Sequence, residues 1–76
     1  MEKGMLHLAR YFCGENLYVD VIREDTGRPV DQDYWLCDTG SDCRRFMFSR
    51  TFRTEKQEMD TICEYVRAYK KEKKYA

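Results

Sequence analysis

The sequence predicts a small α+β domain, in which an antiparallel sheet of about three to four strands carries one long C-terminal helix across one face. Apolar and polar residues alternate cleanly through residues 17–23, which is typical of a half-buried strand. Apolar residues from Met59 onward instead recur at helical spacing. The segments between the strand-like runs are short, and short connections favour antiparallel neighbours. A chain of 76 residues has room for one thin core, so we expect residues 1–76 to form a single domain.

The strands are expected within residues 5–52. Four runs rich in apolar, aromatic or β-branched residues predict them: 5–13, 17–23, 34–38 and 44–52. Turn-forming residues at 14–16, 24–29 and 38–42 separate these runs. In the last run, even positions place Phe46, Phe48 and Phe52 on one side, and we expect this apolar side to face the helix.

The helix is expected over about residues 54–73. Thr54 and Gln57 have the spacing of a capping box, which marks the first turn of a helix. An apolar stripe follows at i, i+3, i+4, i+7 and i+10: Met59, Ile62, Cys63, Val66 and Tyr69. The core is therefore expected to draw on Leu6, Leu8, Leu17, Val19, Val21, Leu36, Phe46, Phe48, Met59, Ile62 and Val66.

The charge balance excludes a strongly basic protein. Fourteen Lys and Arg offset fourteen Asp and Glu. The two halves differ, however, because residues 1–43 carry four basic and nine acidic groups, and residues 44–76 carry ten basic and five acidic groups. The halves can neutralise one another in the fold, or they can leave one basic surface. Such a surface could meet an acidic protein, a nucleic acid or the acidic face of a second copy.

The cysteines are expected to be free thiols in a cytoplasmic protein. The N-terminal residues lack the apolar segment of a signal peptide, no run is long enough to span a membrane, and a reducing compartment disfavours disulfides. Cys37 and Cys43 are the one pair that could hold a metal across a loop. Zinc ligands in small domains usually lie two to four residues apart, however, and five residues separate these two. We therefore expect no metal and no cofactor.

The stretch Asp38-Thr39-Gly40-Ser41 resembles the catalytic segment of retroviral-type aspartic proteases, which are dimers with one aspartate from each subunit. That chemistry requires a later hydrophobic segment ending in glycine to support the catalytic loop. The chain has no glycine after Gly40. The sequence therefore favours a turn in which Asp38 caps the backbone and Gly40 takes a left-handed conformation, in a protein that is not an enzyme.

Aromatic residues indicate a binding surface instead of a catalytic one. Tyrosine and tryptophan are enriched at the buried centres of protein interfaces. Four of them are expected to gather on the sheet face that the helix leaves open: Tyr11, Tyr18, Tyr34 and Trp35. We therefore expect a non-enzymatic interaction module that binds a protein partner or a second copy of itself, through this aromatic face or through a sheet edge.

The alternative is a small domain that binds RNA or single-stranded DNA. Arginines alternate with aromatic residues through 44–53. This pattern is typical of nucleic-acid-binding surfaces on which aromatic rings stack on bases and neighbouring cations bind phosphates. The basic residues that would serve this function are Arg44, Arg45, Arg50, Arg53, Lys70, Lys71, Lys73 and Lys74. Small glycine positions between the aromatics, typical of RNA-recognition sheets, do not occur here.

Overall fold

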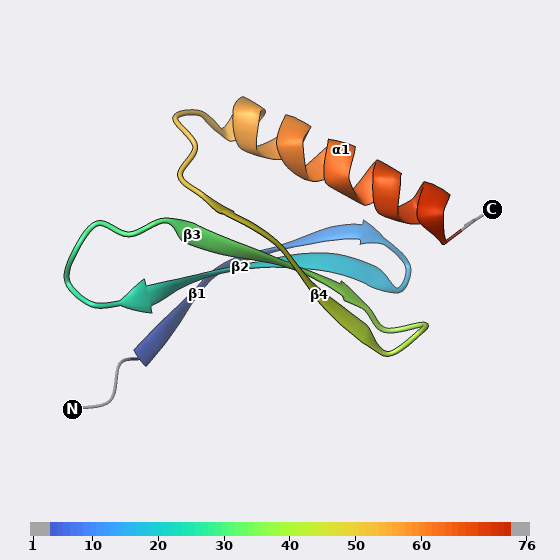
Figure 1. The fold of residues 1–76 in the computed structure, drawn as a ribbon, viewed down its shortest axis with the longest axis horizontal. Coiled ribbons are helices and arrows are strands. Elements are labelled where there is room, and N and C mark those ends of the chain that lie inside the picture. The colour runs from blue at the N-terminus through green and yellow to red at the C-terminus, as the bar shows by residue number, and fades with distance from the viewer. Residues whose placement is uncertain (1–3, 74–76) are drawn as a thin grey trace.

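The computed structural model describes residues 4–73 and confirms the α+β fold (Figure 1). Four antiparallel strands lie in the order β1-β2-β3-β4, and one helix crosses the sheet. The elements are β1 (Gly4–Gly14), β2 (Leu17–Asp25), β3 (Gln32–Asp38), β4 (Cys43–Arg50) and α1 (Glu55–Glu72). The sheet is thus a simple meander with the helix on one face only (Figure 1).

The turn between β3 and β4 is built by the Asp38 carboxylate. Its Oδ1 accepts hydrogen bonds from the backbone amides of Gly40 and Ser41, at 3.1 and 3.4 Å. These bonds confirm the prediction that Asp38 caps the backbone of this turn. The left-handed residue of this turn is Asp42, with φ of 50°, and not Gly40 as predicted. Aspartate tolerates this conformation better than most residues because its short polar side chain bonds locally. In the β2–β3 loop the left-handed residue is Gly27, with φ of 73°.

The helix begins at the predicted cap. The Thr54 hydroxyl accepts a hydrogen bond from the Gln57 amide at 3.2 Å. Ile62, Val66 and Tyr69 are buried against the sheet. Cys63 is exposed, so its predicted place on the buried stripe is wrong.

The core lies between α1 and the sheet. The buried apolar residues of its cluster are Leu17, Val19, Val21, Tyr34, Leu36, Met47, Ile62, Val66 and Tyr69. Phe48 and Met59 pack against this cluster and are partly buried, as predicted for core members. Leu6, Leu8 and Phe46 were predicted in the core but are exposed.

A β-bulge explains the error at Phe46. Tyr34 pairs with Phe48 and the next residue, Trp35, pairs with Phe46, so Met47 is the extra residue in β4. The bulge reverses the alternation and places Phe46 and Phe48 on opposite faces of the sheet. Phe48 stacks on Tyr34 at 4.8 Å beneath α1, whereas Phe46 contacts Trp35 at 5.3 Å on the other face.

Two carboxylates connect the helix to the sheet. Glu58 of α1 accepts hydrogen bonds from the hydroxyls of Tyr11 at 3.1 Å and Tyr34 at 2.5 Å. At the other end of the helix, the Tyr69 hydroxyl donates to Asp38 Oδ2 at 2.7 Å. Burial and the Glu58 carboxylate both raise the pKa of Tyr34, so this hydroxyl stays protonated beneath the helix.

Candidate functional site

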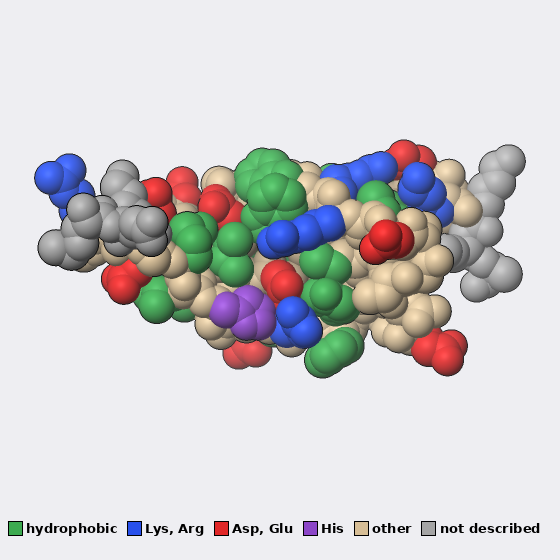
Figure 2. Space-filling model, turned by 90° about the horizontal axis from the view of Figure 1, so that it is seen from below, with side chains coloured by type: hydrophobic (Ala, Val, Ile, Leu, Met, Phe, Trp, Pro, Cys, Tyr) green, Lys and Arg blue, Asp and Glu red, His purple; other side chains and the backbone are tan. Residues whose placement is uncertain are grey.

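The sheet surface that α1 does not cover is called the open face here, and Figure 2 shows it. Strand register places its side chains in rows that cross all four strands, and two of these rows carry aromatic rings. One row is Phe12, Tyr18, Cys37 and Arg44. The other row is Arg10, Asp20, Trp35 and Phe46. Apolar side chains and charges of both signs are mixed across this surface, together with His7, the only histidine (Figure 2).

The open face carries aromatic rings that are not packed into the core. Phe12 is 76% exposed and Phe46 is 45% exposed. Phe12 lies against Tyr18, with ring centroids 6.1 Å apart, and Phe46 meets Trp35 edge-on. The open face therefore exposes one phenylalanine ring on each edge strand, Phe12 on β1 and Phe46 on β4, and each ring lies beside a partly buried tyrosine or tryptophan.

Two arginines cover ring faces on this surface. The guanidinium of Arg10 lies 4.2 Å from the centre of the Tyr18 ring, and that of Arg44 lies 4.7 Å from the centre of the Trp35 ring. Both distances are in the range of cation–π attraction. The stacking holds the arginine side chains against the sheet, so their positions are defined before any partner binds.

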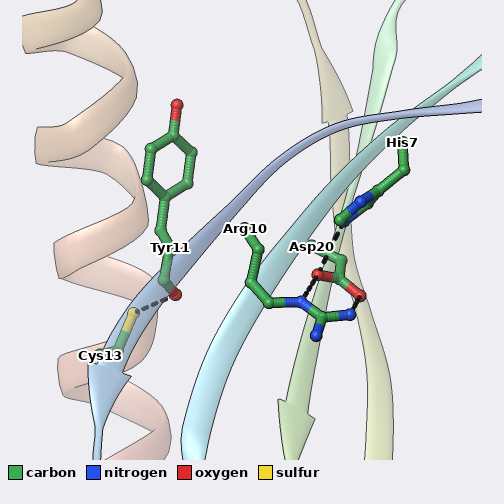
Figure 3. Close-up of polar contacts among 5 residues, drawn as sticks. All are labelled: His7, Arg10, Tyr11, Cys13 and Asp20. Atoms are coloured by element: carbon green, nitrogen blue, oxygen red, sulfur yellow. Dashed lines mark hydrogen bonds and ion pairs between the residues drawn. The ribbon is translucent and has the colours of Figure 1, made fainter.

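Asp20 joins the two basic side chains of β1 in a polar cluster (Figure 3). Arg10 donates from Nε to Asp20 Oδ1 at 2.7 Å and from Nη2 to Oδ2 at 3.1 Å, and His7 Nε2 lies 3.0 Å from Oδ1. Burial raises the pKa of Asp20, but the hydrogen bonds from Arg10 and His7 outweigh burial and hold this pKa below its ordinary value. Asp20 is therefore ionised at neutral pH and offsets the charge of Arg10.

Two of the four predicted protein-binding residues lie on the open face, namely Tyr18 and Trp35. The prediction that Tyr11 and Tyr34 join them is wrong. Tyr34 is fully buried beneath α1, and Tyr11 points toward the helix, where both hydroxyls bond Glu58 (Figure 3 shows Tyr11 beside α1). A buried tyrosine needs a hydrogen-bond partner for its hydroxyl, and Glu58 supplies an acceptor for both hydroxyls on the helix side.

Sequence reasoning missed Phe12 and Phe46 as members of this surface. Phe12 faces the same way as Tyr18 because the two residues pair across the β1–β2 turn. That signal was present in the sequence, since the turn at 14–16 brings residues 12 and 18 opposite each other. The signal for Phe46 was absent, because it depends on the bulge at Met47.

The predicted nucleic-acid residues do not form one surface. Arg44 lies on the open face, but Arg45 lies on the helix side, where it bonds both carboxylate oxygens of Glu72 at 3.3 Å. Lys70 donates to the backbone carbonyl of Cys13 at 2.9 Å, beside α1.

The remaining predicted basic residues are also dispersed. Arg50 stacks over Phe52 at 5.4 Å, next to the loop that leads to α1. Arg53 is exposed in that same loop, whereas Lys71 is exposed near the opposite end of the helix. Lys74 lies outside the described residues.

The two candidate metal ligands point to different sides of the sheet. Cys37 pairs with Arg44 on the open face, and Cys43 pairs with Asp38 on the helix side. Within residues 4–73, no three His, Cys, Asp or Glu side chains are grouped so that they could hold a metal ion. The thiols of Cys13, Cys37, Cys43 and Cys63 are all free.

Comparisons of the chain with protein-family models, curated protein sequences and solved structures gave no match. No helix in the described part of the chain combines the length and the apolar character needed to cross a membrane.

Proposed function

We propose that the protein is a non-enzymatic interaction module whose open face binds a protein partner. The observation that carries this proposal is the pair of arginine-covered aromatic rings beside exposed Phe12 and Phe46. Tryptophan, tyrosine and arginine dominate the energetic centres of protein interfaces. Stacked rings and guanidinium groups also lose little side-chain entropy on binding, because they are already held in place.

The charges on the open face define the chemistry of the partner. Arg10 is neutralised by Asp20, whereas Arg44 stacks on Trp35 and forms no ion pair with residues 4–73. A complementary protein surface would present apolar side chains to Phe12 and Phe46 and a carboxylate to Arg44. A bidentate contact between arginine and a carboxylate adds directional specificity to such an interface.

The same face is less suited to a nucleic acid. The ring faces of Tyr18 and Trp35, on which bases would stack, are covered by guanidinium groups. The ionised Asp20 carboxylate lies in the same row as Trp35 and would repel phosphates. The other basic residues are dispersed, so no continuous positive path crosses the face for a backbone to follow.

Site-specific photocrosslinking tests the proposal. In one variant, an amino acid with a benzophenone side chain replaces Phe46. In the control variant, it replaces Glu64, which is exposed on α1. Both variants are expressed in cells. We expect position 46 to crosslink one protein saturably and position 64 not to do so. Once that partner is purified, Phe46→Ala and Arg44→Ala should each raise the Kd for it by about tenfold or more, because each removes one side chain from the centre of the interface.

Three outcomes would overturn the proposal. Two of them are equal crosslinking from both positions and an affinity for the captured protein that neither alanine variant changes. The other is binding of fluorescent oligo(U) or oligo(dT) that weakens steeply with added salt, because that response marks phosphate contacts.

A further inference from the structure

The edge strand β1 is strongly apolar for an unpaired sheet edge. It is 11 residues long, and within residues 4–73 it pairs only with β2. Its ionisable side chains are His7 and Arg10, together with Tyr11 and Cys13 beneath α1. Among the described residues, five large apolar side chains are exposed, and four of them belong to β1: Met5, Leu6, Leu8 and Phe12. Edge strands usually carry charges or proline that prevent pairing with another chain.

The helix covers only the second half of β1. Its contacts with α1 come from Tyr11, which bonds Glu58, and from Cys13, whose carbonyl accepts from Lys70. The first half of the strand extends away from the helix toward the N-terminal end (Figure 1). The apolar side chains of this first half are therefore exposed because the chain's own helix does not reach them.

A groove of about 590 Å³ runs beside the second half of β1, between the strand and the helix. Its helix side is lined by Met59, Ile62, Cys63 and Val66, and by the basic residues Arg67 and Lys70. One half of β1 thus presents uncovered apolar side chains, and the other half borders an apolar groove.

We propose that β1 pairs antiparallel with β1 of a second copy, so that the two sheets become continuous and both helices lie on the same side. A two-fold axis at the middle of β1 places the first half of each strand beside the groove of the other copy. Each copy then supplies apolar side chains from the first half of β1 to the groove of the other copy, so the same contact occurs twice, as in an isologous dimer interface. This interface runs along the edge of β1 and shares Phe12 with the open face, but it does not depend on the proposed function.

The faces of β1 restrict the register of this pairing. Met5 and Phe12 lie on the open face, and Leu6 and Tyr11 lie on the helix side. A register that keeps the faces matched sets Met5 opposite Phe12 of the partner subunit and Leu6 opposite Tyr11 of the partner subunit. The register of β1 with β2 shifts between His7 and Ala9, so Leu8 forms a β-bulge. In the proposed pairing this bulge falls next to the two-fold axis, and the regular segments on both sides of it can pair.

Charge also favours a second copy as the occupant. Asp25 of β2 flanks the start of β1, opposite Gly4 and on the helix side of the sheet. Arg67 and Lys70 border the groove at the other end of the strand. Antiparallel pairing brings Asp25 of each copy toward Arg67 and Lys70 of the other copy on the helix side, so the attraction occurs twice in the dimer.

The length of β1 is sufficient for a small specific interface. At about 3.3 Å per residue the strand is about 36 Å long, and a sheet edge with its side chains is roughly 10 to 15 Å deep. Each copy would then bury roughly 400 to 500 Å², which brings the total close to the roughly 1,000 Å² of the smallest specific interfaces.

Sedimentation equilibrium of the wild-type chain and three variants tests the dimer. The wild-type chain should sediment at twice its mass of 9.2 kDa. Leu6→Lys/Leu8→Lys, or the single change Met5→Lys, should lower the mass to 9.2 kDa, because each places a charge on the pairing edge. The control Phe46→Lys introduces the same charge at an exposed ring on β4 and should leave the dimer intact.

Amide hydrogen exchange tests which strand forms the interface. Relative to the wild-type chain, the Leu6→Lys/Leu8→Lys variant should exchange faster across residues 5–12 and equally fast across β3. A monomeric wild-type chain would overturn the proposal. A dimer that Phe46→Lys dissociates and the β1 variants leave intact would also overturn it, because the open face would then form the interface.

Discussion

The two faces of the sheet both carry aromatic rings, but these rings have different contacts. On the helix side, Tyr34 and Tyr69 are buried and their hydroxyls bond the carboxylates of Glu58 and Asp38. On the open face, Phe12 and Phe46 are exposed. The comparison indicates that the aromatic rings on the helix side contribute more to stability than the exposed rings of the open face.

A carboxylate-to-amide change on the helix side should have the larger effect. Glu58→Gln removes the charge and leaves one acceptor oxygen for two tyrosine hydroxyls, so a charge-assisted hydrogen bond to the helix is lost, while Tyr34 keeps its bond to Gln32 at 2.9 Å. We expect the free energy of unfolding to fall by about 1–3 kcal/mol, measured by urea denaturation at neutral pH. Glu64→Gln is the matched control, because this residue is exposed on the same helix and should change stability by less than about 0.5 kcal/mol. Equal effects of the two variants would show that Glu58 does not connect the helix to the sheet.

The same chemical change on the open face should have a smaller effect that depends on pH. The pKa of Asp20 is lowered in the folded state, so its contribution to stability is complete above its unfolded pKa of about 4 and is lost as the pH falls through the lower folded value. Asp20→Asn should therefore reduce stability by about 1 kcal/mol or less at neutral pH, since Arg10 is 43% exposed.

Denaturation of wild type and Asp20→Asn at a series of pH values measures this dependence. The difference between them should shrink when the pH is lowered below about 4. A difference that grows on acidification would contradict the proposed role of the Arg10–Asp20 pair.

The sequence predicted the architecture because periodicity and capping are local signals. The alternation at residues 17–23, the short turns and the Thr54 cap all correspond to structural elements. The core residues of β2 and α1 followed from the same patterns. These elements are regular, so a residue's place in the sequence determines which way it faces.

The candidate site was predicted less well because it depends on features that break this regularity. The bulge at Met47 moved Phe46 from the predicted core to the open face. The buried hydrogen bonds to Glu58 placed Tyr11 and Tyr34 beneath the helix. Tyr18 and Trp35 were assigned to the correct face because β2 and β3 pair without a shift. Bulges and buried polar pairs arise from tertiary contacts, which have no fixed spacing in the sequence.

The most direct test of the account compares Phe46→Ala with Phe48→Ala. These residues share the same side chain and are two positions apart, but Phe48 packs beneath α1 against Tyr34 and Phe46 is 45% exposed. Urea denaturation should show a loss of about 2–4 kcal/mol for Phe48→Ala and less than about 1 kcal/mol for Phe46→Ala. Equal losses for both variants would place the two rings on the same side of the sheet and contradict the account.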